Sequence, residues 1–191
     1  MKIFRILFLS ILAGLILAAT AVCQQTSEKV SLQITEQNGK YVLTVPVSHL
    51  VMTIQKGGLA KTKNPFGGAG DSPRYFMLQD SSLHLIVSGW FESDEHFDGI
   101  KKLWATDVAA WKQRNLPEAK DVSFEDVGKW QTIFYDTTSP AKGQSHIRAE
   151  WVQDGTWIDL HLSFTSDDKS QTERRDRLRK ELKAIQVDKK P

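Results

Sequence analysis

The sequence predicts an α+β fold, in which a single antiparallel β-sheet carries a long amphipathic helix on one face and is followed by a C-terminal helix. Three observations support this prediction. Short runs of alternating apolar and polar residues recur between residues 30 and 165, as in half-buried strands. Asp154-Gly155 separates two such runs, which is a strong signal for a β-hairpin. The segment from Phe97 to Trp111 has apolar residues spaced by three and four, as on one face of a helix.

The first 21 residues have the features of a secretory signal peptide. Lys2 and Arg5 precede an uncharged apolar run from Ile6 to Ala21, and Ala19-Thr20-Ala21 fits a small-x-small cleavage site. The run is shorter than the ~20 residues that a membrane-spanning helix needs, so cleavage is favoured over an uncleaved anchor. We therefore expect residues 1–21 to be removed and the mature protein to be secreted or periplasmic.

Cys23 is the single cysteine, so no internal disulfide can form. A cysteine shortly after the apolar run of a signal is also where bacterial lipoproteins carry their lipid, although the preceding Thr20-Ala21-Val22 fits the lipoprotein pattern poorly. Lipid attachment at Cys23 is therefore kept as an alternative. Apart from this lipid and the signal peptide, we expect no contact with a membrane.

The remaining chain is expected to form one domain over residues 30–187, between a polar lead at 22–29 and a tail at 188–191. Loss of Lys2 and Arg5 takes the basic residues from 25 to 23, which equals the 23 acidic residues. Nucleic-acid binding depends mainly on neutralising phosphates, so this balance argues against a nucleic-acid partner.

Runs 30–35 and 41–45 predict two strands joined at Asn38-Gly39, and 50–54 predicts a third strand. The glycine-rich stretch at 57–72 lacks the Gly-Lys-Ser/Thr ending of a phosphate-binding loop, so we interpret it as a long connection that is also open to a binding role. Runs 75–79 and 83–91 predict two more strands. In the second, His84 and Trp90 share a face and would border the hairpin's polar row if the two strands are neighbours.

The helix predicted at 97–111 should be capped by Ser93 or Asp94 and should pack on the apolar face of the sheet. Its solvent side is expected to carry Lys101, Lys102, Asp107, Lys112 and Arg114. Strands are then predicted at 122–124 and 130–135, with a loop at 137–143. A last helix is predicted to start in the stretch Asp167-Asp168-Lys169-Ser170, and its mixed charges are typical of a solvated face.

The hairpin at 144–166 organises the prediction. With a two-residue turn, Gln153 faces Thr156, and the apolar cross-strand pairs are then Trp151 with Ile158, Ala149 with Leu160 and Ile147 with Leu162. The opposite face carries the ionisable side chains that form the candidate site, which we call the polar row: His146, Arg148, Glu150, Asp159 and His161.

The polar row has three interpretations. Imidazole and carboxylate groups together ligate zinc or iron, although Arg148 would repel a cation. Arg148 would equally hold an anionic substrate through paired hydrogen bonds. The simplest interpretation is a water-exposed sheet face with cross-strand charge pairs.

Motifs for common enzyme classes are absent from the sequence. It has no Gly-x-Ser-x-Gly and no His-Glu-x-x-His, and Cys23 lies beside the signal peptide. We therefore expect no cofactor and favour a non-enzymatic binding or accessory protein of the bacterial periplasm or cell envelope, with a protein or small-molecule partner. The alternatives are a metal-dependent or acid–base enzyme using the polar row, and a carrier of an apolar ligand using Trp104, Trp111 and Trp130.

In the order of its elements, the chain from about Val30 to Val187 resembles the Mog1/PsbP-like α/β sandwich. That family includes extrinsic photosystem proteins and a nuclear-transport factor. The resemblance implies a sheet covered by helices, and no functional residue is transferred from it.

Overall fold

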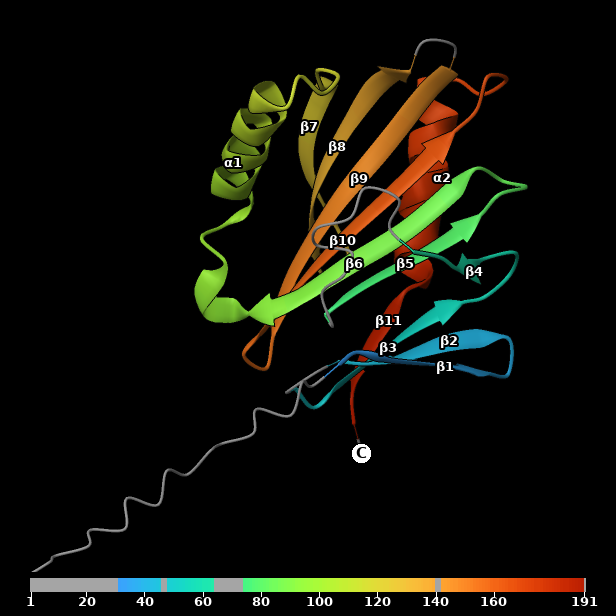
Figure 1. The fold of residues 1–191 in the computed structure, drawn as a ribbon, viewed down its shortest axis with the longest axis vertical. Coiled ribbons are helices and arrows are strands. Elements are labelled where there is room, and N and C mark those ends of the chain that lie inside the picture. Colours follow the sequence, from blue (N-terminus) through green and yellow to red (C-terminus); the bar gives the residue numbers. More distant parts are fainter. Residues whose placement is uncertain (1–30, 46–47, 64–73, 140–141, 191) are drawn as a thin grey trace, which may run out of the picture.

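The computed structural model describes residues 31–45, 48–63, 74–139 and 142–190. Within these residues, two antiparallel sheets of seven and four strands are accompanied by two α-helices (Figure 1). The prediction of a single sheet is therefore wrong, and the protein is mostly β. The predicted signal peptide, Cys23 and positions 64–72 of the glycine-rich connection lie outside the described residues.

The seven-stranded sheet has the order β4-β5-β6-β10-β9-β8-β7. Its strands are β4 (Ala60–Lys61), β5 (Tyr75–Asp80), β6 (Leu85–Ser93), β7 (Lys120–Val127), β8 (Trp130–Ser139), β9 (Lys142–Gln153) and β10 (Thr156–Thr165). Strands β8 and β9 extend into the predicted loop at 137–143, so residues 137–139 and 142–143 are strand rather than loop.

The predicted hairpin forms with the predicted register. Gln153 pairs with Thr156, Trp151 with Ile158 and Glu150 with Asp159 in β9 and β10. Asp154 and Gly155 have φ of 50° and 71°, which is the backbone that a two-residue turn of this twist requires.

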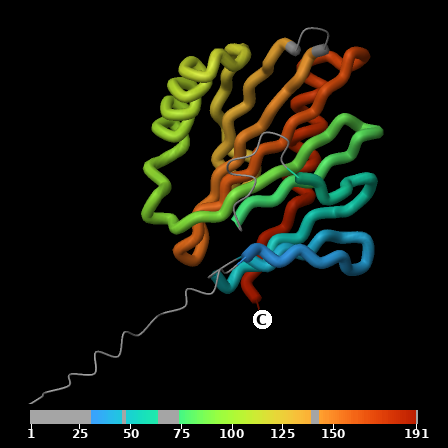
Figure 2. The backbone as a smooth tube through the Cα atoms, viewed as in Figure 1, coloured from blue at the N-terminus to red at the C-terminus, as the bar shows by residue number. Residues whose placement is uncertain are grey.

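The four-stranded sheet joins the two ends of the chain in the order β1-β2-β3-β11. Its strands are β1 (Gln33–Gln37), β2 (Lys40–Thr44), β3 (Leu50–Gln55) and β11 (Gln186–Lys189). Figure 2 shows the red C-terminal strand returning beside the teal strand β3, in agreement with the pairing of Gln186 with Thr53. Strand β11 thus takes in the first two residues of the segment 188–191 that the sequence suggests is a tail.

The apolar core lies between the large sheet, the small sheet and α2 (Gln171–Ala184). The side chains of Leu178 and Leu182 on α2 are fully buried, as are Leu43 and Met52 from the small sheet. From the hairpin, the fully buried residues are Ile147, Ala149, Ile158, Leu160 and Leu162. The apolar face predicted for the hairpin therefore does build the core.

Helix α2 is held by its first turn and by its arginines. Ser170 and Glu173 form a reciprocal capping box at its start. Arg175 pairs with Asp136 of β8, and Arg179 lies 4.5 Å above the ring of Phe134. The predicted solvated face is therefore partly wrong, because some of these arginines pack on the sheet.

Helix α1 (Ile100–Gln113) covers the other face of the large sheet. Tyr135 of β8 contacts Trp104 and Trp111 of α1, whereas the adjacent Phe134 contacts α2. Neighbouring strand residues point to opposite faces, so the two helices lie on opposite sides of the sheet. Helix α1 contacts β8, and Figure 1 shows it at the end of the sheet formed by β7 and β8. The prediction that this helix packs on the apolar face is wrong, because α2 and the small sheet occupy that face.

A short 3₁₀ turn (Asp94–His96) precedes α1, and Gly99, at φ 96°, takes the N-cap position without a side-chain cap. The predicted capping by Ser93 or Asp94 is therefore wrong. Every residue of α1 keeps some solvent exposure, which indicates a lighter contact with the sheet than that of α2.

Candidate functional site between α1 and the large sheet

All five residues of the polar row lie on the sheet face under α1. Glu150 is completely buried, His146 is 7% exposed, and the side chains of Arg148 and Asp159 are 20% and 13% exposed. The water-exposed interpretation is therefore wrong, because α1 shields this face. Asp107, predicted on the solvent side of α1, instead points at the sheet and pairs with Arg148.

Arg148 is the centre of a buried ionic cluster. Its Nε donates to Asp159 Oδ1 at 2.9 Å, its Nη2 donates to Asp159 Oδ2, and its Nη1 donates to Asp107 Oδ2. Burial by itself would lower the pKa of Arg148, but the surrounding carboxylates raise it, so the guanidinium stays charged. Burial raises the pKa of Asp107, and the Arg148 charge opposes that shift.

Glu150 is the least satisfied member of the cluster. Its Oε2 accepts a hydrogen bond from Trp157 Nε1 at 2.5 Å. Its Oε1 lies 3.2 Å from Arg148 Nε but receives no hydrogen bond. Burial and the neighbouring Asp159 charge raise the pKa of Glu150 well above 4.5. The cluster therefore holds three carboxyl groups around a single guanidinium.

The two histidines form a stacked row with Tyr135. The Tyr135 and His146 rings are parallel at 4.6 Å between centroids, and His161 Nε2 lies 3.1 Å from both Tyr135 Oη and His146 Nδ1. His146 Nε2 lies 2.9 Å from Thr137 Oγ1, which donates to Gln144. A neutral set of tautomers fits this chain: Nε2–H of His146 donates to Thr137 Oγ1, and the single Nε2–H of His161 is shared between two acceptors, His146 Nδ1 and Tyr135 Oη.

Both imidazoles are neutral at physiological pH. Burial, assisted by the nearby Arg148 charge, lowers the pKa of His161 to about 4. Burial and the His161 ring lower the pKa of His146 well below 6.5. Burial also raises the pKa of Tyr135, so its phenol keeps its proton. Tyr135, His146 and His161 are therefore polar but uncharged.

A pocket of about 360 Å³ opens above these groups. Arg148, Asp159 and His161 form part of its wall, whereas His146 and Glu150 are buried and do not line it. The pocket also has four aromatic residues from three strands and α1, together with two small residues of β6: Tyr75, Trp90, Trp111, Tyr135, Ser88 and Gly89. Its size lies within the usual range for small-molecule sites.

Sequence reasoning identified part of this pocket. Trp90 borders it because β6 pairs with β10 and places Trp90 opposite Asp159, as the neighbouring-strand hypothesis required. His84 does not border it, since it lies in the turn before β6 with φ 51°. Tyr75 and Tyr135 were missed as site residues. Only the order of the strands, which no local pattern gives, could have placed them there.

Trp104, Trp111 and Trp130 do not share a site. Trp130 contacts Trp151 on the core face, with ring centroids 5.5 Å apart, and is 2% exposed. Trp104 and Trp111 lie on the α1 side, where their rings contact Tyr135. The three-tryptophan carrier site is therefore wrong, although Trp111 does line the pocket.

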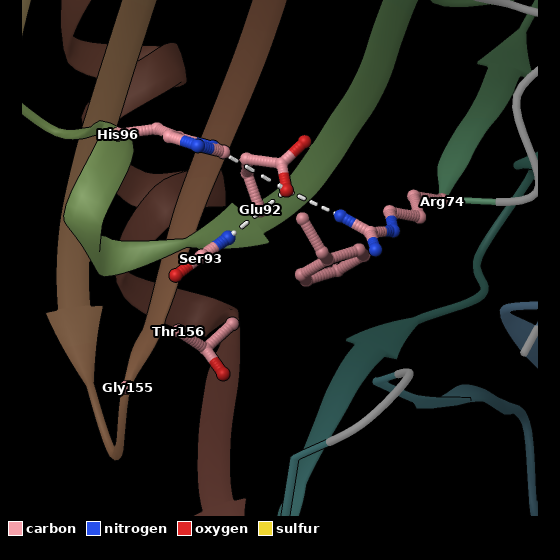
Figure 3. A pocket seen from close by; sticks show the side chains of 7 residues that line it. Arg74, Glu92, Ser93, His96, Gly155 and Thr156 are labelled. Carbon is pink, nitrogen blue, oxygen red and sulfur yellow. Dashed lines mark hydrogen bonds and ion pairs between the residues drawn. The ribbon is translucent and has the colours of Figure 1, made fainter.

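A second hollow of about 360 Å³ lies where β5 and β6 meet the turn of the hairpin (Figure 3). Arg74 and His96 approach Glu92 from two sides, and the Ser93 amide donates to the same carboxylate at 3.1 Å. The side chains of Arg74 and His96 are 40% and 63% exposed. Ion pairs between exposed side chains are screened by water and contribute little, so we place the candidate site in the pocket under α1, where the charged groups are buried.

The polar row does not have the arrangement of a metal site. Across the described ranges, no group of three or more His, Cys, Asp or Glu side chains is placed to hold a metal ion. No helix in the same part of the chain is long and apolar enough to span a membrane.

No family model matches the chain, and no curated protein matches it. Among solved structures, it is similar to a protein from Bacteroides thetaiotaomicron VPI-5482, whose crystal structure was determined at 1.50 Å, with 11% sequence identity and a TM-score of 0.42. The match covers 74% of this chain and 45% of that protein, so the chain matches less than half of its length.

Proposed function

We propose that the protein is an exported, non-enzymatic binding protein that holds a small organic ligand in the pocket under α1. The observation that carries this proposal is the pocket itself, whose wall combines four aromatic residues with the polar groups of Arg148, Asp159 and His161. Mostly aromatic walls with a small number of oriented polar groups are typical of small-molecule sites. Export rests on the signal peptide predicted from residues 1–21.

The protonation states of the site favour binding over acid–base catalysis. A general base works best when its pKa lies near the operating pH. The pKa of about 4 makes His161 a weak base at neutral pH, and the raised pKa of Tyr135 makes its phenol a weak acid. In addition, Asp159 is held by two hydrogen bonds from Arg148.

Acid–base catalysis remains the second candidate because Tyr135 Oη and His161 Nε2 form a hydrogen bond of 3.1 Å at the pocket. A ligand that displaces water there would bring its polar group to both atoms. Incubation of an identified ligand with the protein, followed by mass spectrometry, separates the two functions. Recovery of the ligand unchanged supports binding, and a product whose formation requires His161 supports catalysis.

The binding proposal is tested with a library of small aromatic molecules of mixed charge, using isothermal titration calorimetry on the mature protein. We expect at least one compound to bind with 1:1 stoichiometry and Trp111→Ala to weaken its binding tenfold or more. Trp151→Ala is the matched control, because Trp151 is a partly exposed tryptophan on the other face of the sheet. The proposal fails if no compound binds, or if Trp111→Ala leaves the affinity unchanged.

Export is tested separately, by mass spectrometry of the protein purified from a bacterial host. A mature chain that begins at residue 22 supports export as a free protein. A lipid-modified Cys23 at the N-terminus supports export as an envelope-anchored protein, whereas an intact Met1 with the protein in the cytoplasm contradicts export.

A further inference from the structure

The charges around the pocket do not balance. Arg148 contacts three carboxyl groups: those of Asp107, Glu150 and Asp159. Even with Glu150 protonated, two carboxylates face one guanidinium. Neither His146 nor His161 supplies a positive charge at neutral pH, because burial keeps both imidazoles neutral. The site is therefore negative in sum.

The aromatic walls of the pocket also favour a positively charged ligand. The face of an aromatic ring carries a negative electrostatic potential that attracts cations, most strongly for tryptophan. Tyr75 lies directly opposite Trp90 across β5 and β6, and Trp90 lies opposite Asp159 across β6 and β10. A single row across three strands thus places two aromatic rings beside a carboxylate, and Trp111 of α1 lines the same pocket.

Arg148 offers little to an anion. Three of its N–H groups are already donated to Asp107 and Asp159, so its charge is compensated inside the protein. An anionic ligand would meet Asp159 at the same wall and would be repelled by it. The grip of Arg148 on an anionic substrate, one of the interpretations of the polar row, is therefore disfavoured.

We propose that the pocket under α1 binds a small organic cation, with an amine or quaternary ammonium group beside Asp159 and an apolar body against the rings of Tyr75, Trp90 and Trp111. This inference rests on the proposed binding function and names its ligand class. The competing explanation is that Glu150 and Asp107, whose pKa values are both raised by burial, are both protonated, which leaves Arg148 and Asp159 as a neutral pair. In that case the pocket would show no preference for positive charge.

The test uses three probes of the same shape: 2-phenylethylamine, 2-phenylethanol and phenylacetate, which are cationic, neutral and anionic at pH 7.5. Calorimetry or tryptophan fluorescence with the full mature protein gives the three affinities. We expect the amine to bind at least tenfold more tightly than the alcohol, and phenylacetate to bind more weakly than the alcohol. Added salt should weaken binding of the amine more than binding of the alcohol.

Two variants locate the preference. Asp159→Asn should lower the affinity for the amine tenfold or more and leave the affinity for the alcohol within threefold of its original value. Trp90→Leu, which keeps Asp159 and Arg148 in place, should also weaken binding of the amine more than binding of the alcohol. This variant remains informative if Asp159→Asn fails to fold. Asp126→Asn is the control, because Asp126 is an exposed carboxylate of β7 that does not line the pocket.

The outcomes separate the two proposals. Equal binding of the amine and the alcohol, or tighter binding of phenylacetate, overturns the cation inference but leaves the binding function in place. Failure of all three probes, together with failure of the mixed library, overturns both. An amine preference that survives both Asp159→Asn and Trp90→Leu also overturns the inference, because the cation would then bind elsewhere.

Discussion

The two faces of the seven-stranded sheet are built in opposite ways. On one face, α2 and the small sheet bury Leu178, Leu182 and the apolar side of the hairpin without solvent contact. On the other face, α1 rests on aromatic rings and an ionic cluster, and every one of its residues keeps some exposure. The first face supplies the hydrophobic stabilisation of the fold. The second keeps an open pocket beside oriented polar groups, which is what a binding site requires.

The largest expected effect comes from breaking the ionic cluster. Arg148→Met removes the charge that pairs with Asp107 and Asp159 and leaves buried carboxylates without a partner. Removing one partner of a buried ion pair costs ~3–5 kcal/mol, so we expect that loss in the free energy of unfolding. Urea denaturation followed by circular dichroism measures it. Arg177→Met is the control, because Arg177 forms a more exposed pair with Glu181 and should change stability by less than ~1 kcal/mol.

A loss below ~1 kcal/mol for Arg148→Met would contradict this picture. It would mean that the carboxyl groups take up protons and stay buried at little cost. The pocket face would then depend on α1 packing rather than on charge pairing.

The register of the hairpin was predictable, whereas its surroundings were not. Asp154-Gly155 and the alternation around it determine which residues pair, because the turn type and the two-residue period leave one register. Which helix covers which face depends on contacts distant in sequence. The stripe Trp104–Trp111 is equally compatible with either face, and Asp107, which pairs with Arg148 of the sheet, was predicted on the solvent side of the helix.

The second sheet was missed for the same physical reason. Asn38-Gly39 correctly predicted the turn between β1 and β2. The separation of these strands from the large sheet depends on β11, which pairs Val187 with Met52 across 135 positions of the chain. The segment that forms β11 is short and polar enough to resemble a tail, so its pairing carried no local signal.

The next largest effect separates stability from binding. Leu178→Ala creates a cavity in the α2 face, where Leu178 is fully buried, and should cost ~2–5 kcal/mol in the free energy of unfolding. At temperatures where the variant remains folded, we expect its affinity for a pocket ligand to stay within threefold of the original value. Trp111→Ala should show the reverse pattern, with a smaller loss of stability and a large loss of affinity. Parallel losses in both variants would mean that the two faces are not independent.

A change of pH should have a smaller effect on the free energy of unfolding, and His161 and Glu150 should contribute to it with opposite signs. The pKa of His161 is about 4 in the folded protein and near 6.5 when unfolded, so the unfolded chain binds more protons between these values. Stability should therefore fall as pH decreases from 6.5 to 4, and His161→Gln should flatten this dependence.

Glu150 has the opposite dependence. Its folded pKa lies above 4.5, so the folded protein binds more protons and stability should fall as pH rises from 4.5 toward that raised pKa. Glu150→Gln should remove this decline. Asp107, whose pKa is also raised by burial, contributes in the same direction as Glu150. Urea unfolding at a series of pH values measures both slopes, and slopes that shift in the same direction in the two variants would contradict the assignment.

The smallest expected effect on stability concerns the N-termini of the two helices. α2 begins with the reciprocal Ser170–Glu173 capping box, whereas α1 begins at Gly99 with no side-chain cap. Ser170→Ala should cost ~1 kcal/mol of stability, because an N-cap hydroxyl satisfies a backbone N–H that is otherwise unpaired.

In the original protein we expect amides of α1 to exchange with solvent faster than those of α2, since α1 has neither a side-chain cap nor a fully buried residue. Hydrogen exchange read by mass spectrometry tests both points, and Ser170→Ala should speed exchange in the first turn of α2 while leaving α1 unchanged. Equal protection of the two helices in the original protein would show that the aromatic and ionic contacts under α1 hold it as firmly as the core holds α2. The pocket would then be a rigid cavity that a ligand enters without movement of α1.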